Sequence, residues 1–318
     1  MKRVVFGILL GYECNNNCIF CYDGYFRNRI PPISTEEAKR LLQFGREQGA
    51  NVAHILGGEP TIRRDIFELV KFAEDLGYDE IMMTTNGRML SYPQFAEKIV
   101  DAGVNHIIFS IHGPKEIHDR MTRTPGAWEQ AMRGLKNILK LRDEGREILV
   151  SNNTVITTIN MQHLPWIVRE FWPRRLNVLL FIYPHPEGNA LKYYQKLAPP
   201  LDELRKHVLE TIDTKEKLEK SIGNMGQRIG FRYVPLCLVW PRNLTYVDEY
   251  LEGQIIGSKE IHSGPDFMDL DVEEGRRQIG RTYTPKCREC KMKGICEGVW
   301  NYYTEVHGLR GIKPIKDA

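Results

Sequence analysis

The sequence predicts an α/β fold, in which a parallel sheet curls into a partial, TIM-like (β/α)6 barrel and a small cysteine-containing C-terminal domain follows. From residue 4 to about residue 188, six short apolar segments alternate with five amphipathic segments. This alternation is typical of βα units, in which each helix crosses over between two parallel strands. Because such crossovers are right-handed, six strands curl toward a barrel. After residue 188 the chain becomes more charged, and four of its seven cysteines lie beyond residue 230.

The predicted strands are apolar, β-branched runs at residues 4–10, 52–56, 80–84, 106–111, 148–157 and 178–183. The predicted helices between them cover residues 35–48, 64–76, 92–102, 127–142 and 161–171. Ser34, with Glu37 three residues later, supplies a capping start for the first helix. A charged helix at 201–220 flanks the barrel, and a glycine-containing connector follows at 221–230. We therefore expect a barrel at 1–190, a helical connector at 191–230 and a C-terminal domain at 231–318.

The composition is ordinary for a soluble globular protein, with 42% hydrophobic and 27% charged residues and a net charge of +3. That charge does not call for a nucleic-acid partner, although it does not exclude one. Residues 4–10 predict a first strand better than a signal peptide, because no small-residue cleavage site follows. We expect no membrane span. Seven cysteines in two groups indicate metal ligation in a reducing cytoplasm over disulfides.

Cys14, Cys18 and Cys21 place three thiols in one short loop after the first predicted strand. Thiolates are soft ligands that select iron-sulfur clusters, zinc or copper(I). Three thiolates leave one iron of a four-iron cluster free to bind something other than protein. A structural zinc site would normally close that fourth position.

The motif Cys14-x3-Cys18-x2-Cys21, with Phe20 and Tyr22 around the last cysteine, resembles the signature loop of the radical S-adenosylmethionine (radical SAM) superfamily. This resemblance implies a 4Fe-4S cluster on the three cysteines, whose fourth iron is chelated by S-adenosylmethionine. It also implies reductive cleavage of S-adenosylmethionine to a 5′-deoxyadenosyl radical, which takes a hydrogen atom from the substrate. An electron donor such as a flavodoxin or ferredoxin is then expected.

The turn Gly57-Gly58-Glu59-Pro60 resembles the superfamily's Gly-Gly-Glu-Pro motif, which contacts the amino group of S-adenosylmethionine. Glycines let the backbone approach a ligand closely, and a carboxylate accepts hydrogen bonds from an ammonium group. By the same resemblance, the backbone near Phe20 and Tyr22 is expected to meet the adenine. The remaining candidates for the ribose and the methionyl carboxylate follow strand ends, at Thr85, Asn86, Ser110, Arg123 and Asn153.

Two histidines at predicted strand ends, His112 and His185, are candidates to face the substrate, although a lone histidine is more often a hydrogen-bonded structural residue. Arg123 has a surface ion pair as its alternative. The alternative role for the four polar candidates is hydrogen bonding within a turn or the core; these are Thr85, Asn86, Ser110 and Asn153.

The second cysteine group is Cys287-x2-Cys290-x5-Cys296, with Cys237 further upstream. A closed zinc site is the structural alternative for four such cysteines. The run resembles the SPASM and Twitch domains of radical SAM enzymes, and four cysteines fit the one-cluster Twitch type. The resemblance thus implies an auxiliary 4Fe-4S cluster held by all four. If Cys237 stayed free, an open iron could bind substrate, or the thiol could donate hydrogen to a radical.

These observations predict a radical SAM enzyme whose most favoured substrate is a peptide or protein. Small-molecule, cofactor or natural-product biosynthesis by the same chemistry is the first alternative. Modification of tRNA is the second, supported only by scattered basic clusters such as Arg174-Arg175 and Arg276-Arg277. A zinc-stabilised binding protein without catalysis is the third.

Overall fold

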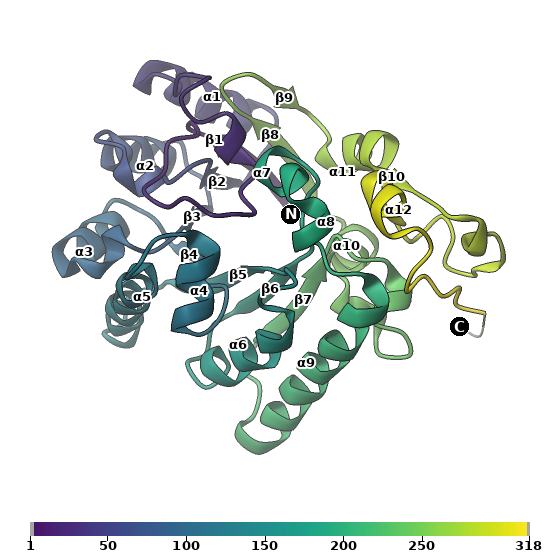
Figure 1. Ribbon diagram of the computed structural model, residues 1–318. Helices are drawn as coiled ribbons and strands as arrows, with labels where there is room; N and C mark the ends of the chain where they lie inside the picture. The colour runs from purple at the N-terminus through teal and green to yellow at the C-terminus, as the bar shows by residue number, and fades with distance from the viewer. Residues whose placement is uncertain (1–2, 317–318) are drawn as a thin grey trace.

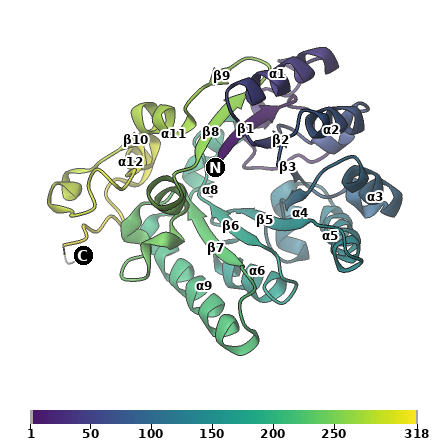
Figure 2. The ribbon, with the colours of Figure 1, turned by 180° about the vertical axis from the view of Figure 1, so that it is seen from behind.

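The computed structural model describes residues 3–316, and within them the main sheet has nine strands in the order β7-β6-β5-β4-β3-β2-β1-β8-β9. Neighbouring strands from β7 to β8 are parallel, and β9 is antiparallel to β8. Figure 1 and Figure 2 show the sheet curling with the helices outside it. Its strands are β1 Val4–Leu9, β2 Val52–Leu56, β3 Glu80–Thr85, β4 His106–Phe109, β5 Leu149–Val155, β6 Val178–Ile182, β7 Arg228–Arg232, β8 Lys259–Ser263 and β9 Met268–Asp269.

The predicted α/β barrel is confirmed, and each of the five predicted helices is present. The Ser34 side chain accepts a hydrogen bond from the backbone N–H of Glu37, so the predicted cap forms. The helices that cover the barrel are α1 Thr35–Glu47, α2 Ile66–Asp75, α3 Pro93–Asp101, α4 Lys115–Thr122, α5 Ala127–Asp143, α6 Leu164–Phe171 and α9 Leu201–Ile222. Short helices are α7 Gly188–Lys192, α8 Tyr194–Leu197, α10 Asp248–Tyr250, α11 Val272–Gly275 and α12 Asn301–His307.

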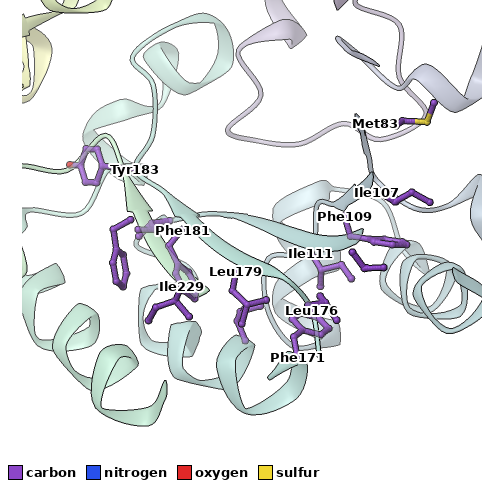
Figure 3. Close-up of a cluster of buried hydrophobic side chains, with 14 of the residues drawn as sticks. Met83, Ile107, Phe109, Ile111, Phe171, Leu176, Leu179, Phe181, Tyr183 and Ile229 are labelled. Atoms are coloured by element: carbon purple, nitrogen blue, oxygen red, sulfur yellow. The ribbon is translucent and has the colours of Figure 1, made fainter. Parts of the chain in front are cut away.

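The largest apolar core lies between the outer face of the sheet and the helices. Figure 3 shows part of it, where Phe109, Leu179 and Phe181 of the strands lie on the same side as Phe171 of α6. Side chains alternate between the two faces of a strand, so the neighbouring positions point into the barrel. At the floor of the barrel these include a small separate cluster of Val5, Val52, Met82 and Ile108.

Three strands, β7, β8 and β9, extend the sheet beyond the six that the sequence predicts. β7 pairs with β6, and β8 pairs with the opposite edge at β1. Residues 228–230 therefore belong to a strand, and the expectation of a connector through residue 230 is wrong there. The two outer strands approach each other, because Arg232 Nη2 of β7 lies 3.3 Å from Glu260 Oε1 of β8.

The C-terminal segment forms a small unit at one side of the barrel, seen in yellow in Figure 1. Its two short strands, β10 Arg281–Thr282 and β11 Val299–Trp300, pair antiparallel. Tyr303 of α12 fastens this unit to the barrel, since its hydroxyl accepts from the backbone N–H of Leu201 at 3.0 Å. None of the helices in residues 3–316 has both the length and the apolar composition of a membrane span.

Candidate active site

The first cysteine loop leaves β1 and is fixed to neighbouring elements by its backbone. Asn17 and Ile19 donate backbone hydrogen bonds to the carbonyls of Thr122 and Met121 at the end of α4, at 3.0 and 2.9 Å. All seven cysteines, each within the described residues, are free thiols. Burial raises the pKa of Cys18, and it raises that of Cys21 to about 12. Since a bound metal deprotonates a coordinating thiol outright, these buried thiols suit ligation better than free thiolate chemistry.

The turn after β2 presses against this loop. Gly57 and Gly58 adopt positive φ angles of 88° and 57°. A Cβ at Gly58 would lie 2.1 Å from the carbonyl oxygen of Glu13, directly before Cys14. Both the conformation and the space therefore require glycine here. The Gly58 N–H donates to Asp23 Oδ2 at 2.9 Å, which joins the turn to the far side of the loop.

Glu59 is buried, with 2% of its surface exposed, and its carboxylate is a hydrogen-bonding hub. Its Oε1 accepts from the backbone and hydroxyl of Thr61 and from the Thr85 hydroxyl, at 3.1, 2.5 and 2.7 Å. Among the described residues, its Oε2 accepts only from the Asn86 N–H, at 2.7 Å. Because a carboxylate oxygen has two lone pairs, Oε2 keeps an acceptor position for a further donor. Contact with the amino group of S-adenosylmethionine stays a prediction.

The predicted polar residues at strand ends fall into two groups. Thr85 and Asn86 hold the site together, since Thr85 bonds Glu59 and Asn86 Nδ2 donates to Asn15 Oδ1 at 2.6 Å. Asn86 Nδ2 also lies 3.8 Å from Cys14 Sγ. Ser110 and Asn153 differ, because neither side chain has a hydrogen-bond partner among the residues that the structure describes. The β4–β5 register places them next to each other on the inner face, where they are open to a ligand.

Two further candidates near this site, His112 and Arg123, have different surroundings. His112 is buried, accepts from the Val155 N–H at 3.3 Å, and packs edge-on against Phe20 with 4.7 Å between ring centroids. Burial lowers its pKa well below the usual range, so it acts here as a neutral support for the cysteine loop. The Arg123 guanidinium lies over the Tyr193 ring at 5.4 Å, and its contact with S-adenosylmethionine stays a prediction.

His185 lies in an aromatic cluster that connects the first cysteine loop to the C-terminal unit. We define this aromatic cluster as Tyr22, His185, Tyr233 and Trp300. The His185 ring lies 4.3 Å from Trp300, 5.8 Å from Tyr233 and 6.4 Å from Tyr22. Burial and the nearby Arg281 lower the pKa of His185 to about 3, so the ring is neutral. Sequence reasoning missed Tyr233 and Trp300; the only signal was that aromatic residues crowd the segment after Cys296.

The four cysteines of the second group lie together in the structure, Cys237 included. Cys237, Cys287, Cys290 and Cys296 line one cavity of about 430 Å³, whose other walls are mainly apolar, among them Leu236, Met292, Val299, Ile312 and Ile315. Backbone N–H groups approach the sulfurs: Gly298 N lies 3.3 Å from Cys296 Sγ, and Ile315 N lies 3.4 Å from Cys290 Sγ. Four convergent thiols with backbone donors in an apolar cavity suit an iron-sulfur cluster. Cys237 stands with the other three rather than with the first loop.

Comparison with known proteins agrees with this geometry. The family model of the Radical SAM superfamily matches residues 8–171. A "Probable GTP 3',8-cyclase" of Sulfurisphaera tokodaii is 28% identical over 214 residues, which cover 66% of either chain. The AdoMet-dependent heme synthase of Oleidesulfovibrio alaskensis is 34% identical over 156 residues, 48% of this chain and 38% of the synthase. The chain thus spans less than two thirds of the length of these relatives.

Solved structures share the fold along nearly the whole chain. Streptococcus suis SuiB bound to S-adenosylmethionine superposes with a TM-score of 0.64 and 17% identity, over 94% of this chain and 73% of SuiB. The anSMEcpe structure with AdoMet and the Cp18Cys peptide has a TM-score of 0.66 and 15% identity, over 99% and 93% of the two chains. More than half of the sequence lies within the match to the family model, and the cysteine loop and glycine turn described above lie within it. The chain belongs to the radical SAM superfamily.

Proposed function

We propose that this chain is a radical SAM enzyme that abstracts a hydrogen atom from a peptide or protein substrate. Cys14, Cys18 and Cys21 would hold the 4Fe-4S cluster, and the face formed by Glu59, Ser110 and Asn153 would hold S-adenosylmethionine. When bound, the cluster supplies the electron that cleaves S-adenosylmethionine. The protein's own share is to orient the cofactor and exclude water, since the cofactors carry the hard chemistry.

The observation that carries the proposal is the pairing of a free three-thiol loop with a turn that only glycine can form. Gly58 brings backbone within contact of Glu13, beside the cysteines, and leaves no room for a side chain. Behind the turn, Glu59 Oε2 keeps an acceptor position, and the partner-free side chains of Ser110 and Asn153 lie on the inner face. A ligand with an ammonium group, a carboxylate and hydroxyls matches this donor and acceptor set.

A second, auxiliary 4Fe-4S cluster on Cys237, Cys287, Cys290 and Cys296 belongs to the same proposal. The convergence of the four thiols in one apolar cavity supports it over a role for Cys237 as a separate hydrogen donor. We also infer a cytoplasmic enzyme that takes electrons from a small donor such as a flavodoxin or ferredoxin. Free thiols at all seven positions fit a reducing compartment.

The peptide substrate is supported by the likeness of fold along almost the whole chain to two proteins solved with peptides, SuiB with its precursor SuiA and anSMEcpe with Cp18Cys. Small-molecule biosynthesis is the second candidate, and the observation that favours it is different. The Fe-coproporphyrin III synthase of Methanosarcina barkeri, 27% identical over 272 residues, is named for the synthesis of a small molecule.

The test is hydrogen transfer. Anaerobically reconstituted protein is reduced with dithionite and incubated with S-adenosylmethionine, and 5′-deoxyadenosine is measured. Deuterated peptides encoded beside the gene are then compared with GTP and a porphyrin. Deuterium in 5′-deoxyadenosine from a peptide alone supports the proposal; transfer from a small molecule alone supports the second candidate; no 5′-deoxyadenosine at all contradicts both.

A further inference from the structure

A polar cavity lies where the two outer strands of the barrel approach each other. We call this the seam pocket; it opens between β7, β8, α11 and the segment Leu251–Ile256, and together with the solvent at its mouth it has a volume of about 360 Å³. Its charged lining residues are Arg232, Glu249, Glu252, Glu260, Glu273 and Arg276. Four carboxylates against two guanidinium groups give the lining an excess of negative charge.

The two arginines offset that excess only in part. Arg232 pairs with Glu260 of the lining, but each arginine is also engaged by a carboxylate outside the lining. Arg232 Nε lies 2.8 Å from Asp248 Oδ2. Arg276 makes a bidentate pair with Glu297, at 2.7 and 2.8 Å. With the arginine and acidic ion-pair partners of the lining residues included, the network contains five arginines and six carboxylates, an excess of one carboxylate. His262 lies 3.9 Å from Glu260 but does not add a positive charge, because burial lowers its pKa.

Glu249 is the carboxylate of this network at which a balancing positive charge is expected. Only 6% of its side chain is exposed. Its Oε1 accepts from the backbone N–H of Tyr233 and lies 3.4 Å from Arg281 Nη2, whereas its buried Oε2 has no partner among the described residues. A buried acceptor without a donor is costly and rare in folded proteins. A donor that the chain itself does not provide is therefore expected at this oxygen.

We propose that the seam pocket binds a primary ammonium group of the substrate, such as a lysine side chain or the amino terminus of a peptide. An ammonium carries the single charge that the network lacks and three donors, and it is compact enough for the cavity. A divalent metal ion fits less well, since the described residues that line the pocket bring no three carboxyl, histidine or cysteine groups together as metal ligands. This inference rests on the proposed function for the nature of the substrate, though not for the binding itself.

The position of the pocket connects it to the candidate active site. The Glu249 carboxylate holds the backbone of Tyr233, whose ring contacts His185 of the aromatic cluster. His185 contacts Tyr22, the residue after Cys21. A substrate anchored by its ammonium in the seam pocket would extend along these rings toward the first cysteine loop. Arg276 and Arg281 lie over the Tyr233 ring at 5.5 Å and fix its orientation.

Protonation of Glu249 is the competing explanation of its unpartnered oxygen. Burial raises the pKa of this carboxyl, and a proton on Oε2 would cancel the excess charge without any ligand. The two explanations predict different ligand selectivity. A charged carboxylate prefers an ammonium to an uncharged group of the same size, and a protonated one does not.

The experiment titrates the anaerobically reconstituted holoprotein, without S-adenosylmethionine, by calorimetry. The probes are n-butylammonium chloride, n-butanol and sodium butyrate at one ionic strength. We expect butylammonium to bind at least about tenfold more tightly than butanol, and Glu249→Gln to remove about tenfold of that affinity, the range of a charged hydrogen bond. Glu273→Gln, at a less buried lining position, should weaken binding in the same direction. Glu274→Gln, at the exposed neighbouring acid, should change nothing.

Equal binding of butylammonium and butanol, or unchanged ammonium affinity in both Glu249→Gln and Glu273→Gln, overturns the inference. Magnesium chloride is titrated in the same way, and tighter binding of magnesium than of butylammonium overturns the inference as well. If Glu249→Gln does not fold by circular dichroism, Glu273→Gln decides. Because no turnover is measured, the result is independent of S-adenosylmethionine cleavage. If the protein forms 5′-deoxyadenosine but shows no preference for the ammonium, this inference alone is wrong. If it prefers the ammonium but forms no 5′-deoxyadenosine, the proposed function alone is wrong.

Discussion

Glu59 Oε2 accepts the backbone N–H of Asn86 at 2.7 Å, and this hydrogen bond ties the turn after β2 to the turn after β3. Asn86 in turn bonds Asn15 within the first cysteine loop. One buried carboxylate thus positions three segments that lie far apart in the sequence.

Replacing Glu59 with glutamine should therefore damage the fold as well as cofactor binding. The single amide oxygen of glutamine cannot accept all four donors, and its NH2 group would face some of them. We expect a loss of about 2–4 kcal/mol in the free energy of unfolding, from unpaired buried donors. Urea denaturation measures it. Glu13→Gln, at an exposed acid one residue before Cys14, is the matched control. Equal stability of the two variants would contradict the role of Glu59 as a hub.

Gly58→Ala should be far more disruptive than the same change at Gly77. Both residues have positive φ angles, 57° and 75°, so both substitutions strain the backbone, at about 1 kcal/mol. At Gly77 a Cβ meets nothing within 4 Å, whereas at Gly58 it would lie 2.1 Å from the Glu13 carbonyl oxygen. We expect Gly58→Ala also to lower iron incorporation at the first cysteine loop. A similar melting temperature and iron content in the two variants would refute the steric argument.

The two cysteine groups should lose metal independently. Cys18→Ala with Cys21→Ala should remove about half of the iron and acid-labile sulfide of reconstituted protein, and so should Cys287→Ala with Cys290→Ala, because each group is expected to hold one cluster. Iron, sulfide and zinc analyses check this. Zinc retained in the first double variant, without sulfide, would identify the C-terminal site as a zinc site.

Acid stability should depend on Glu80 on the floor of the barrel. Burial alone would raise the pKa of this carboxyl, but hydrogen bonds with His106 and Arg3 lower it to about 2. Since the folded-state pKa lies below the unfolded value, the stabilisation is complete above about pH 4.5 and is lost as the pH falls toward 2. From the size of the shift, this stabilisation amounts to about 3 kcal/mol. Chemical unfolding of Glu80→Gln between pH 2 and 5 should show a flatter pH dependence, while exposed Glu97→Gln should follow the parent protein.

Much of the barrel could be predicted from the sequence, because its first six strands are apolar runs bounded by turns. β7 and β8 could not, since their inward positions are charged or polar: Arg228 and Arg232 on one, Glu260 and His262 on the other. Those side chains form ion pairs with each other and with Asp248 and Glu252, which lie between the two strands in sequence. In a sequence, charged residues at alternating positions indicate a surface segment. Only in the assembled barrel do these charged side chains lie in the interior.

The candidate site, like the barrel, could be predicted from the sequence only in part. The cysteine spacing and the glycine turn are local motifs, so the sequence predicted both groups of thiols. The aromatic cluster depends on Tyr233 and Trp300 meeting His185, three residues from separate elements. The surplus carboxylate of the seam pocket likewise emerges only after every ion pair in the assembled fold is counted.

The ion pair between Arg232 and Glu260 also has a consequence for the order of assembly. β1 is synthesised well before its outer neighbour β8, which follows β7 in the chain. Until then β1 has an open edge, which is a hazard for aggregation. A fragment that ends after the sixth strand would leave both edges of the sheet, β1 and β6, without a neighbour. The barrel can therefore close only when the later strands β7 and β8 have been made.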